Sequence, residues 1–342
     1  MSKDNHHGSH KPTIKDVASL AGVGTTTVSR VINNGSVRAD TRSKVLDAME
    51  KLQFHPHVLA RGLRTKRIPT VGMIISDISN PLFAEIVQSA HQVLADRGYQ
   101  LELGITNTNP TEETHLFESF IRQGVSGIIA SLTVDSNKKI TRFITGLNIP
   151  IVLLDRQLVD IDMNVVTNDH AKGSKEAVDY LAALGHTKIS LILSSSLTYP
   201  GRIRKQSILS QLSSHGITIP ECYIHEVSLE PEQGYKSMMK LLNCEDRPTA
   251  VIVGSNQIFI GALQAMRQLG IEYPKDISII SFDDIYLTKL LSPDITIVNR
   301  NLKDFGAEAA HLVITQIEHP SAGITKRILP TWLEIRGSCR RV

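Results

Sequence analysis

The feature that most constrains the fold of this chain is the stretch TIKDVASLAGVGTTTVSRVINN, residues 13–34, which predicts two short helices joined by a tight turn. Thr13 and Asp16 have the spacing of a capping box, in which two side chains satisfy the free N–H groups at a helix start. Apolar residues then follow at helical spacing. Gly22 suits the left-handed conformation that ends a helix sharply, so a second helix begins at about Thr25.

This second helix, from about Thr25 to Ile32, is predicted to bury its valines and to expose a polar face. The outward-facing residues are Thr25, Thr26, Ser29 and Arg30. Such a unit is a helix-turn-helix, whose second helix fits the major groove of DNA. Ordinary helical hairpins also show capping boxes and glycine turns, but two further pieces follow here. Residues 39–54 predict a third amphipathic helix, and residues 55–67, HPHVLARGLRTKR, are basic.

The charge of the chain is distributed unevenly. Residues 1–70 contain 12 Lys and Arg against 5 Asp and Glu, a net charge of +7, whereas the remaining residues carry −4. A basic first domain on a mildly acidic body predicts a polyanionic partner for that domain alone. Residues 1–12 contain His6, His7 and His10 in a polar sequence, which we interpret as a flexible tail and not as a metal site.

Several classes of protein are disfavoured by what the sequence lacks. It has no run of 18 apolar residues and no signal-peptide pattern at its start, so we expect a soluble, cytoplasmic protein without a membrane partner. Three scattered cysteines, Cys222, Cys244 and Cys339, do not suit a disulfide framework or a zinc site. The phosphate-loop, dinucleotide, nucleophile-elbow and zinc-helix motifs of common enzymes do not occur. We therefore predict no catalytic residues, no metal and no cofactor.

From Pro69 onward, short apolar runs alternate with amphipathic helical segments. The apolar runs are residues 70–76, 99–106, 127–132, 149–155, 188–194, 249–255 and 277–283. This alternation predicts an α/β fold in which parallel sheets are covered by helices on both faces. This number of strand–helix units, over about 270 residues, is more than a single domain usually contains. We therefore predict a core of two doubly wound parallel-sheet subdomains behind an all-α headpiece.

Polar side chains follow the predicted strands at the point where each strand ends. In open parallel sheets, ligands bind outside these carboxyl ends. The candidate residues are Ser76, Asp77, Asp155, Arg156, Arg202, Arg204, Asn256, Gln257, Asp283 and Asp284. Carboxylates, amides and guanidinium groups together suit a small polar or polyhydroxylated ligand. Taken singly, each is equally expected as a helix cap or turn residue, above all Asn80, Asn256 and Asp284.

The sequence resembles the lactose-repressor (LacI/GalR) family of bacterial transcription regulators from about Thr13 to Arg336. The similar segments are the helix-turn-helix, HPHVLARGLR, NPLFAEIV, ALGHTKIS, PTAVIVGSN, PKDISIISFDD, SPDITIV and LEIRGS. The resemblance implies a headpiece at residues 13–55, a hinge helix and linker at 56–68, and an effector-binding and dimerisation core at 69–342. That core is expected to be similar to periplasmic sugar-binding proteins, working as a homodimer or a dimer of dimers.

The resemblance also implies where the core divides and where its pattern departs from the family. One subdomain is expected at about 69–163 and 298–325, and the other at about 164–297 and 326–340. The departures are Gly24 at a usual serine cap, Gly62 inside the hinge helix, Asn168-Asp169 in inverted order, Gln257 for a frequent aspartate and Ser281 for a usual glycine.

Contacts to a palindromic double-stranded operator follow from the same resemblance. Thr25, Thr26 and Arg30 look like base-reading positions, where an arginine can pair bidentately with a guanine. Leu63 is similar to the hinge-helix leucine that wedges into the minor groove and kinks the DNA. The implied phosphate or groove contacts are Thr13, Ser29, Asn33, Arg42, Arg61 and Arg64. The alternatives are that Arg30 contacts only phosphate and that Leu63 packs on the core.

For the effector site, the resemblance points to Asp77, Phe83, Asp155, Arg156, Arg204, Asn256 and Asp283. It implies a small carbohydrate-like effector between the subdomains, whose binding shifts a hinge closure and so the pairing of the hinge helices. The strings IVLLDRQL and SFDDI look most like ribose-repressor members, so ribose or a related pentose is our first expectation. Arg156 and Arg204 equally suit a sugar acid or a sugar phosphate. Control by a protein partner is a further alternative, and repression of a carbohydrate operon is the commoner role.

Overall fold

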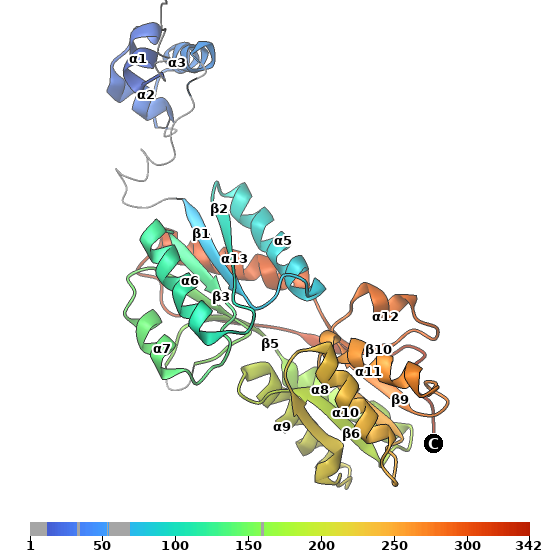
Figure 1. The fold of residues 1–342 in the computed structure, drawn as a ribbon. Helices are drawn as coiled ribbons and strands as arrows, with labels where there is room; N and C mark the ends of the chain where they lie inside the picture. The colour runs from blue at the N-terminus through green and yellow to red at the C-terminus, as the bar shows by residue number, and fades with distance from the viewer. Residues whose placement is uncertain (1–11, 33–34, 53, 55–68, 159–160) are drawn as a thin grey trace, which may run out of the picture. The chain divides into compact units, whose positions relative to one another are not determined.

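The computed structural model describes residues 12–32, 35–52, 54, 69–158 and 161–342 (Figure 1). The chain divides into two compact units, residues 1–68 and residues 69–342. Four of the predicted DNA contacts, Asn33, Arg61, Leu63 and Arg64, lie outside the described residues, as does the predicted hinge helix.

The described part of the first unit is a bundle of three helices. They are α1 (Ile14–Ala21), α2 (Thr25–Ile32) and α3 (Ala39–Lys51). Each helix contributes one fully buried valine to a common core, namely Val17, Val28 and Val45. The capping box forms as predicted, because the Thr13 backbone N–H and hydroxyl donate to Asp16 Oδ2 at 2.7 and 2.6 Å. Gly22 ends α1 with a left-handed φ of 64°, so the predicted helix-turn-helix is present.

The first sheet of the second unit has the strand order β11-β5-β4-β3-β1-β2, and its described strand pairs are all parallel. Its strands are β1 (Thr70–Ile75), β2 (Gln100–Ile105), β3 (Gly127–Ala130), β4 (Ile151–Leu154), β5 (Asn164–Asn168) and β11 (Lys326–Leu329). The central strands β1, β3 and β4 are buried along their whole length, as a parallel sheet covered on both faces requires.

The second sheet has the order β12-β10-β9-β8-β6-β7. Its strands are β6 (Ile189–Ser194), β7 (Ile224–Val227), β8 (Ala250–Val253), β9 (Ser278–Phe282), β10 (Thr296–Arg300) and β12 (Thr331–Glu334). The prediction of two parallel sheets is confirmed except at this sheet's edge, where β12 runs antiparallel to β10. Only Pro330 separates β12 from β11 of the first sheet, so the chain runs from one sheet directly into the other.

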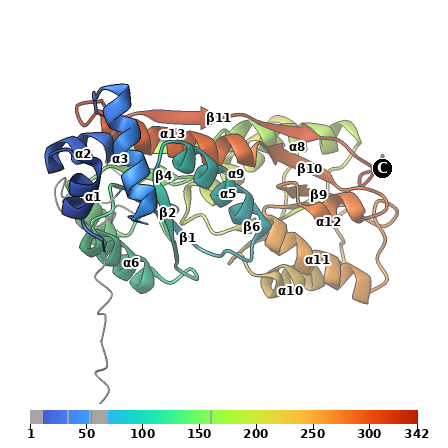
Figure 2. The ribbon, with the colours of Figure 1, turned by 90° about the horizontal axis from the view of Figure 1, so that it is seen from above.

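Helices cover both faces of each sheet. In the first subdomain, one face is covered by α5 (Pro81–Asp96) and α13 (Leu302–Glu318), and the other by α6 (Pro110–Gln123) and α7 (Lys138–Thr145). In the second subdomain, one face is covered by α10 (Pro231–Leu242) and α11 (Asn256–Gln268), and the other by α8 (His170–Ala183) and α9 (Tyr199–Ser214). Figure 2 shows α10 lying beside α11, as does Figure 1. A 3-10 turn, η1 (Glu221–Tyr223), and a short helix, α12 (Tyr286–Leu290), complete the second subdomain.

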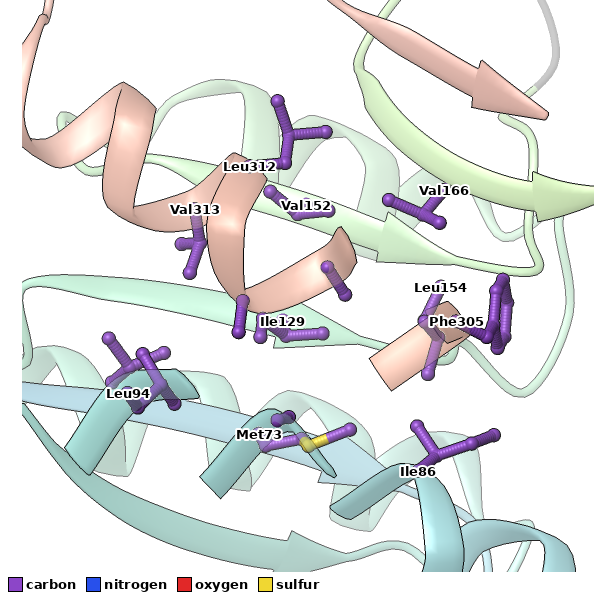
Figure 3. Packing of buried hydrophobic residues seen from close by; sticks show 14 of the residues in the cluster. Met73, Ile86, Leu94, Ile129, Val152, Leu154, Val166, Phe305, Leu312 and Val313 are labelled. Atoms are coloured by element: carbon purple, nitrogen blue, oxygen red, sulfur yellow. The ribbon is translucent and has the colours of Figure 1, made fainter. Parts of the chain in front are cut away.

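The largest apolar cluster lies beneath α5 and α13. Figure 3 shows Met73 and Val152 of the sheet facing Ile86 of α5 and Val313 of α13. The two helices can approach closely because Gly306 has no side chain. A Cβ atom at this position would lie only 2.3 Å from the Ile86 carbonyl oxygen. This close contact holds α5 and α13 against each other on the same face of the sheet.

The chain crosses between the subdomains three times: after β5, after β10 and between β11 and β12. The crossings expected at about residues 163, 297 and 325 lie three to five residues before the ends of β5, β10 and β11, at residues 168, 300 and 329. The reason is that β5 and β11 belong to the first sheet and β10 to the second. The first subdomain therefore comprises residues 69–168 and 301–329, and the second comprises 169–300 and 330–342.

Candidate functional site

The exposed face of α2 carries the side chains predicted to read DNA bases. Thr25, Thr26 and Arg30 are exposed, whereas Val28 and Val31 on the other face are buried. A short helix that buries one face and offers hydroxyls and a guanidinium on the other has the chemistry needed to contact base edges in a major groove.

Two of the predicted phosphate contacts are also structural. Thr13 caps α1 through Asp16, and Arg42 donates from a terminal nitrogen to the Gly35 carbonyl oxygen at 2.7 Å. This bond ties α3 to the chain that follows α2. The Arg42 guanidinium has further N–H groups beyond it, so a phosphate contact remains compatible with this role. Ser29, a third predicted contact, is half-buried.

A cavity of about 70 Å³ lies between the two core subdomains, at the carboxyl ends of the strands. Six of the seven predicted effector residues line it, namely Phe83, Asp155, Arg156, Arg204, Asn256 and Asp283. Asp77 is not among the lining residues. Its carboxylate accepts the Ser79 backbone N–H and hydroxyl, at 2.7 and 2.9 Å, and so holds the loop after β1. The remaining polar lining residues are Asn80, Ser131, Ser194, Thr198, Ser255 and Arg300.

Arg300, the last residue of β10, joins the two subdomains at the centre of this site. Its Nε donates to Asp283 Oδ1 and a terminal nitrogen donates to Asp155 Oδ2, both at 2.7 Å. Asp155 follows β4 of the first subdomain and Asp283 follows β9 of the second. All three side chains are buried. Burial alone would lower the pKa of Arg300, but Asp283 and Asp155 raise it above its ordinary value, so this cation stays charged.

Both aspartates reach Arg300 from an unusual backbone conformation. Asp155 and Asp283 have left-handed φ values of 53° and 69°. Aspartate is one of the few residues besides glycine that tolerates this region. The conformation turns each chain sharply at its strand end, and the geometry of the two carboxylates therefore depends on the ends of β4 and β9.

His170, at the start of α8, completes the environment of Asp155. Its Nε2 lies 2.7 Å from Asp155 Oδ1, which also accepts the Thr167 hydroxyl at 3.0 Å. Its Nδ1 accepts from the Arg204 guanidinium at 3.3 Å, so the proton lies on Nε2 and the ring is neutral. Burial is the main cause that lowers the pKa of His170, in agreement with this assignment. Both carboxylate oxygens of Asp155 thus have partners within the protein.

Arg204 of α9 lies over the Phe282 ring, with its guanidinium carbon 4.3 Å from the ring centre. A terminal nitrogen donates to the Gly254 carbonyl oxygen at 2.6 Å. Together with His170, these groups hold the buried guanidinium in place without a direct bond to a carboxylate among the described residues. Burial lowers the pKa of Arg204 to about 10, opposed by Asp283 and reinforced by Arg300.

Arg156 has an environment of its own on the first subdomain. It donates to the backbone carbonyl oxygens of Leu132, at 2.5 Å, and of Asp155, at 2.8 Å. Two buried acids, Asp135 and Glu113, stabilise its charge, although burial raises the pKa of each of them. Arg156 therefore has acidic neighbours that Arg204 lacks.

Further polar bonds cross the cleft on either side of Arg300. Asn256 at the start of α11 donates from Nδ2 to Asn80 Oδ1 at 2.7 Å, and Asn80 in turn caps α5. Asp135 pairs with Arg202 of α9 at 3.3 Å, and its backbone N–H donates to the Leu197 carbonyl oxygen. The arrangement described is therefore a closed one, in which the two subdomains contact each other directly.

Arg300 and His170 were not among the predicted site residues. The predicted residues are polar groups at the ends of apolar runs, whereas Arg300 is the last residue of a strand that was not predicted and His170 is the first residue of a helix. The Asn80 prediction as a cap is right, but its second role in bonding Asn256 across the cleft was not foreseen. Within the described ranges, no group of three or more His, Cys, Asp or Glu could hold a metal ion. No helix there is long and apolar enough to cross a membrane.

Comparisons with known proteins agree with both units. Residues 13–57 match the family of bacterial regulatory proteins called the lacI family, and residues 178–339 match a periplasmic binding protein-like domain. The chain is 32% identical over 331 residues to the HTH-type transcriptional regulator DegA of Bacillus subtilis, covering 96% of this chain and 98% of DegA.

Two solved structures are also similar. The lac repressor dimer bound to operator and the anti-inducer ONPF superposes with a TM-score of 0.85 at 25% identity, covering 97% of this chain and 100% of that one. A putative ribose operon repressor from Burkholderia thailandensis has a TM-score of 0.71 at 29% identity, covering 78% of this chain and 99% of that one.

We expect Asp155→Asn to destabilise the protein on the order of 3 kcal/mol at pH 7, because Arg300 loses a charged partner in a buried site. Asparagine tolerates the left-handed backbone, so the change removes the charge and one of the two acceptor oxygens without straining the chain. Burial would raise the pKa of Asp155, but His170 and Arg300 outweigh it and hold the pKa well below its usual range. The stabilisation is therefore complete above about pH 3.9, the unfolded value, and is lost as the pH falls further.

Urea unfolding of both proteins at pH 7 and at pH 3 measures this difference. The difference in free energy of unfolding between wild type and variant should be smaller at pH 3 than at pH 7. An equal difference at both pH values would contradict the low pKa assigned to Asp155. Asp162→Asn is the matched control, because that carboxylate forms an exposed ion pair with Lys326 and should matter little.

Proposed function

The chain belongs to the lacI family of bacterial regulatory proteins, and we propose that a small sugar-like effector bound between its two core subdomains controls its binding to operator DNA. It is a DNA-binding transcriptional repressor of that family, not an enzyme. The observation that carries the proposal is the cavity lined from both subdomains, because a ligand there contacts both at once. The regulated genes are proposed to serve carbohydrate use.

Base reading is proposed for α2. Thr25, Thr26 and Arg30 are its exposed polar residues, and Arg30 has the fork geometry to pair with guanine O6 and N7. Thr13, Ser29 and Arg42 are proposed to contact phosphates, which fixes the register of the headpiece on DNA. Asn33 and the hinge residues Arg61, Leu63 and Arg64 lie outside the described residues, and their roles stay predictions.

A homodimer on a palindromic operator is proposed for the assembly, with a dimer of dimers as the alternative. The similar lac repressor structure is a dimer bound to operator. On the core, α12 exposes Tyr286 and Leu290, which are 79% and 65% accessible. Large apolar side chains exposed side by side on one short helix favour burial against a partner.

The effector is proposed to be a small carbohydrate, neutral or acidic, of about pentose size. Asp283 and Asn256 supply polar atoms to the cavity, and Phe83 adds an aromatic ring to its lining. Polar groups at strand ends next to a partly apolar wall suit a polyhydroxylated ring. The similarity to a putative ribose operon repressor supports a pentose, and the arginines of the cavity support an acidic sugar.

The proposed mechanism is a shift between arrangements of the two subdomains. The direct bonds across the cleft, among them Asn80–Asn256 and Arg300–Asp155, define the closed state. An effector changes the equilibrium only by its difference in affinity for the closed and open states. Because it contacts both subdomains at once, an effector in this cavity favours closure, and closure then alters the spacing of the two headpieces.

We expect Asp283→Asn to reduce the effector response at least tenfold while leaving operator affinity within about twofold. The measurement is fluorescence anisotropy on an operator selected from random DNA, titrated with any sugar that stabilises the protein. Asparagine keeps the left-handed backbone and an acceptor for Arg300. An unchanged effector response in this variant would remove Asp283 from the site.

We expect Arg30→Ala to weaken binding to the selected operator about 10- to 150-fold and to relax one base position. Binding to random DNA should change much less. Lys15→Ala is the matched control, because Lys15 is an exposed cation on α1 and not on the reading face. Equal losses on selected and random DNA would show that Arg30 contacts only phosphate.

A further inference from the structure

The arginines that line the cavity differ in how directly a carboxylate contacts them. Its charged lining residues are Asp155, Arg156, Arg204, Asp283 and Arg300, three cations and two anions. The neighbouring His170 is neutral, because its Nδ1 accepts from Arg204 and its Nε2 donates to Asp155. Asp135 and Glu113 are buried near Arg156 just outside this lining, so the contacts of each arginine, and not the count of lining charges, show which cation lacks a partner.

The two anions are already bound to groups of the protein. Asp155 uses both oxygens, one for Arg300 and one for His170 and Thr167. One oxygen of Asp283, Oδ1, accepts a hydrogen bond from Arg300 Nε. The other oxygen of Asp283 is therefore the main carboxylate acceptor left for the hydroxyl groups of a ligand.

Arg204 is the cavity arginine without an acid of its own, because Asp283 and Asp155, the two acids that raise its pKa, are both bonded to Arg300. Arg300 has two carboxylates at 2.7 Å, and Arg156 has Asp135 and Glu113 nearby. Arg204 has a histidine nitrogen, a carbonyl oxygen and an aromatic ring as its described contacts, none of which carries a negative charge. These contacts engage only some of its five N–H groups while fixing the orientation of the guanidinium, which is the arrangement that prepares an arginine for a carboxylate or phosphate.

We propose that the effector is a small hydroxylated anion, whose carboxylate or phosphate group binds Arg204 while its hydroxyl groups reach Asp283 and Asn256. This inference rests on the proposed function, because it specifies the ligand of the same cavity. A neutral sugar would leave Arg204 without a directly bonded carboxylate or phosphate. An anion balances it and gains charge-assisted hydrogen bonds.

The lowered pKa of Arg204 agrees with this assignment. Burial and the positive charge of Arg300 both disfavour its charged form, and an anion in the cavity would favour it.

The first test uses inorganic phosphate and acetate as probes in thermal unfolding of the full chain, against sodium chloride at equal ionic strength. We expect stabilisation of wild type by about 2 °C or more. The Arg204→Met variant should lose it, and Lys205→Met should keep it. Lys205 is the matched control, since it lies next to Arg204 on α9 but pairs with Glu226 outside the cavity lining. Anion binding by the basic headpiece is common to all three proteins and therefore cancels.

The second test compares three probes of one carbon skeleton, ribose, ribonate and ribose 5-phosphate, with glucose, gluconate and glucose 6-phosphate as a second set. The inference is supported if a sugar acid or a sugar phosphate stabilises wild type but not Arg204→Met. Whichever of the two stabilises wild type more identifies the anionic group of the effector. Stabilisation by the neutral sugars alone, equal in wild type and Arg204→Met, would overturn it while leaving the proposed function intact. Stabilisation by none of the sugars or anions would contradict both.

A ligand-free comparison gives an independent result. Because Arg204 has no carboxylate partner, Arg204→Met should unfold within about 2 °C of wild type or above it, whereas Arg300→Met should unfold several degrees lower. Methionine preserves much of the packing volume of each side chain and removes the charge. Equal destabilisation by both substitutions would show that the charge of Arg204 is already compensated, and would overturn the inference.

Discussion

The bond pair from Arg300 to Asp155 and Asp283 is the interaction on which the rest of the core depends. Arg300, at the end of β10, bonds Asp283 after the neighbouring strand β9 and Asp155 after β4 of the other sheet. One buried cation therefore links the two subdomains. Such a network is stable only when each charge has its partners, since an unpaired buried charge costs several kcal/mol. Asp155 is bonded across the cleft to both Arg300 and His170, so a change at Asp155 or Arg300 alters the closure of the cleft.

Much of the fold could be predicted because parallel strands covered on both faces are continuous apolar runs. The segments around β1, β6 and β9 are of this kind, and they were predicted within two residues of their ends. The strands β5, NVVTN, and β11, KRIL, are short and partly polar, and neither was predicted. Because these two strands are where the chain changes subdomain, their absence also misplaced the predicted crossings.

The site was predicted in part for a similar reason. Side chains directly after apolar runs, such as Asp155 and Asp283, lie where the topology of a parallel sheet requires, and sequence position is enough to find them. Arg300 and His170 depend on which strand ends meet across the cleft, and that is a property of the folded core. Asp77 has the same sequence signal as Asp155 but forms only a turn with Ser79, because a polar residue after a strand serves equally well as a local cap.

The central claim is that Arg300 holds the two core subdomains closed through the carboxylates of both. The most direct measurement is the distance distribution between spin labels on exposed Lys139 of α7 and exposed Lys175 of α8, each replaced by cysteine in a chain whose three native cysteines are serine. With Arg300 present, we predict a population at short distance without added ligand, which grows when an effector binds. With Arg300→Met, we predict that the short-distance population is lost and that the distribution is broader and longer. A distribution unchanged by this substitution would contradict the account.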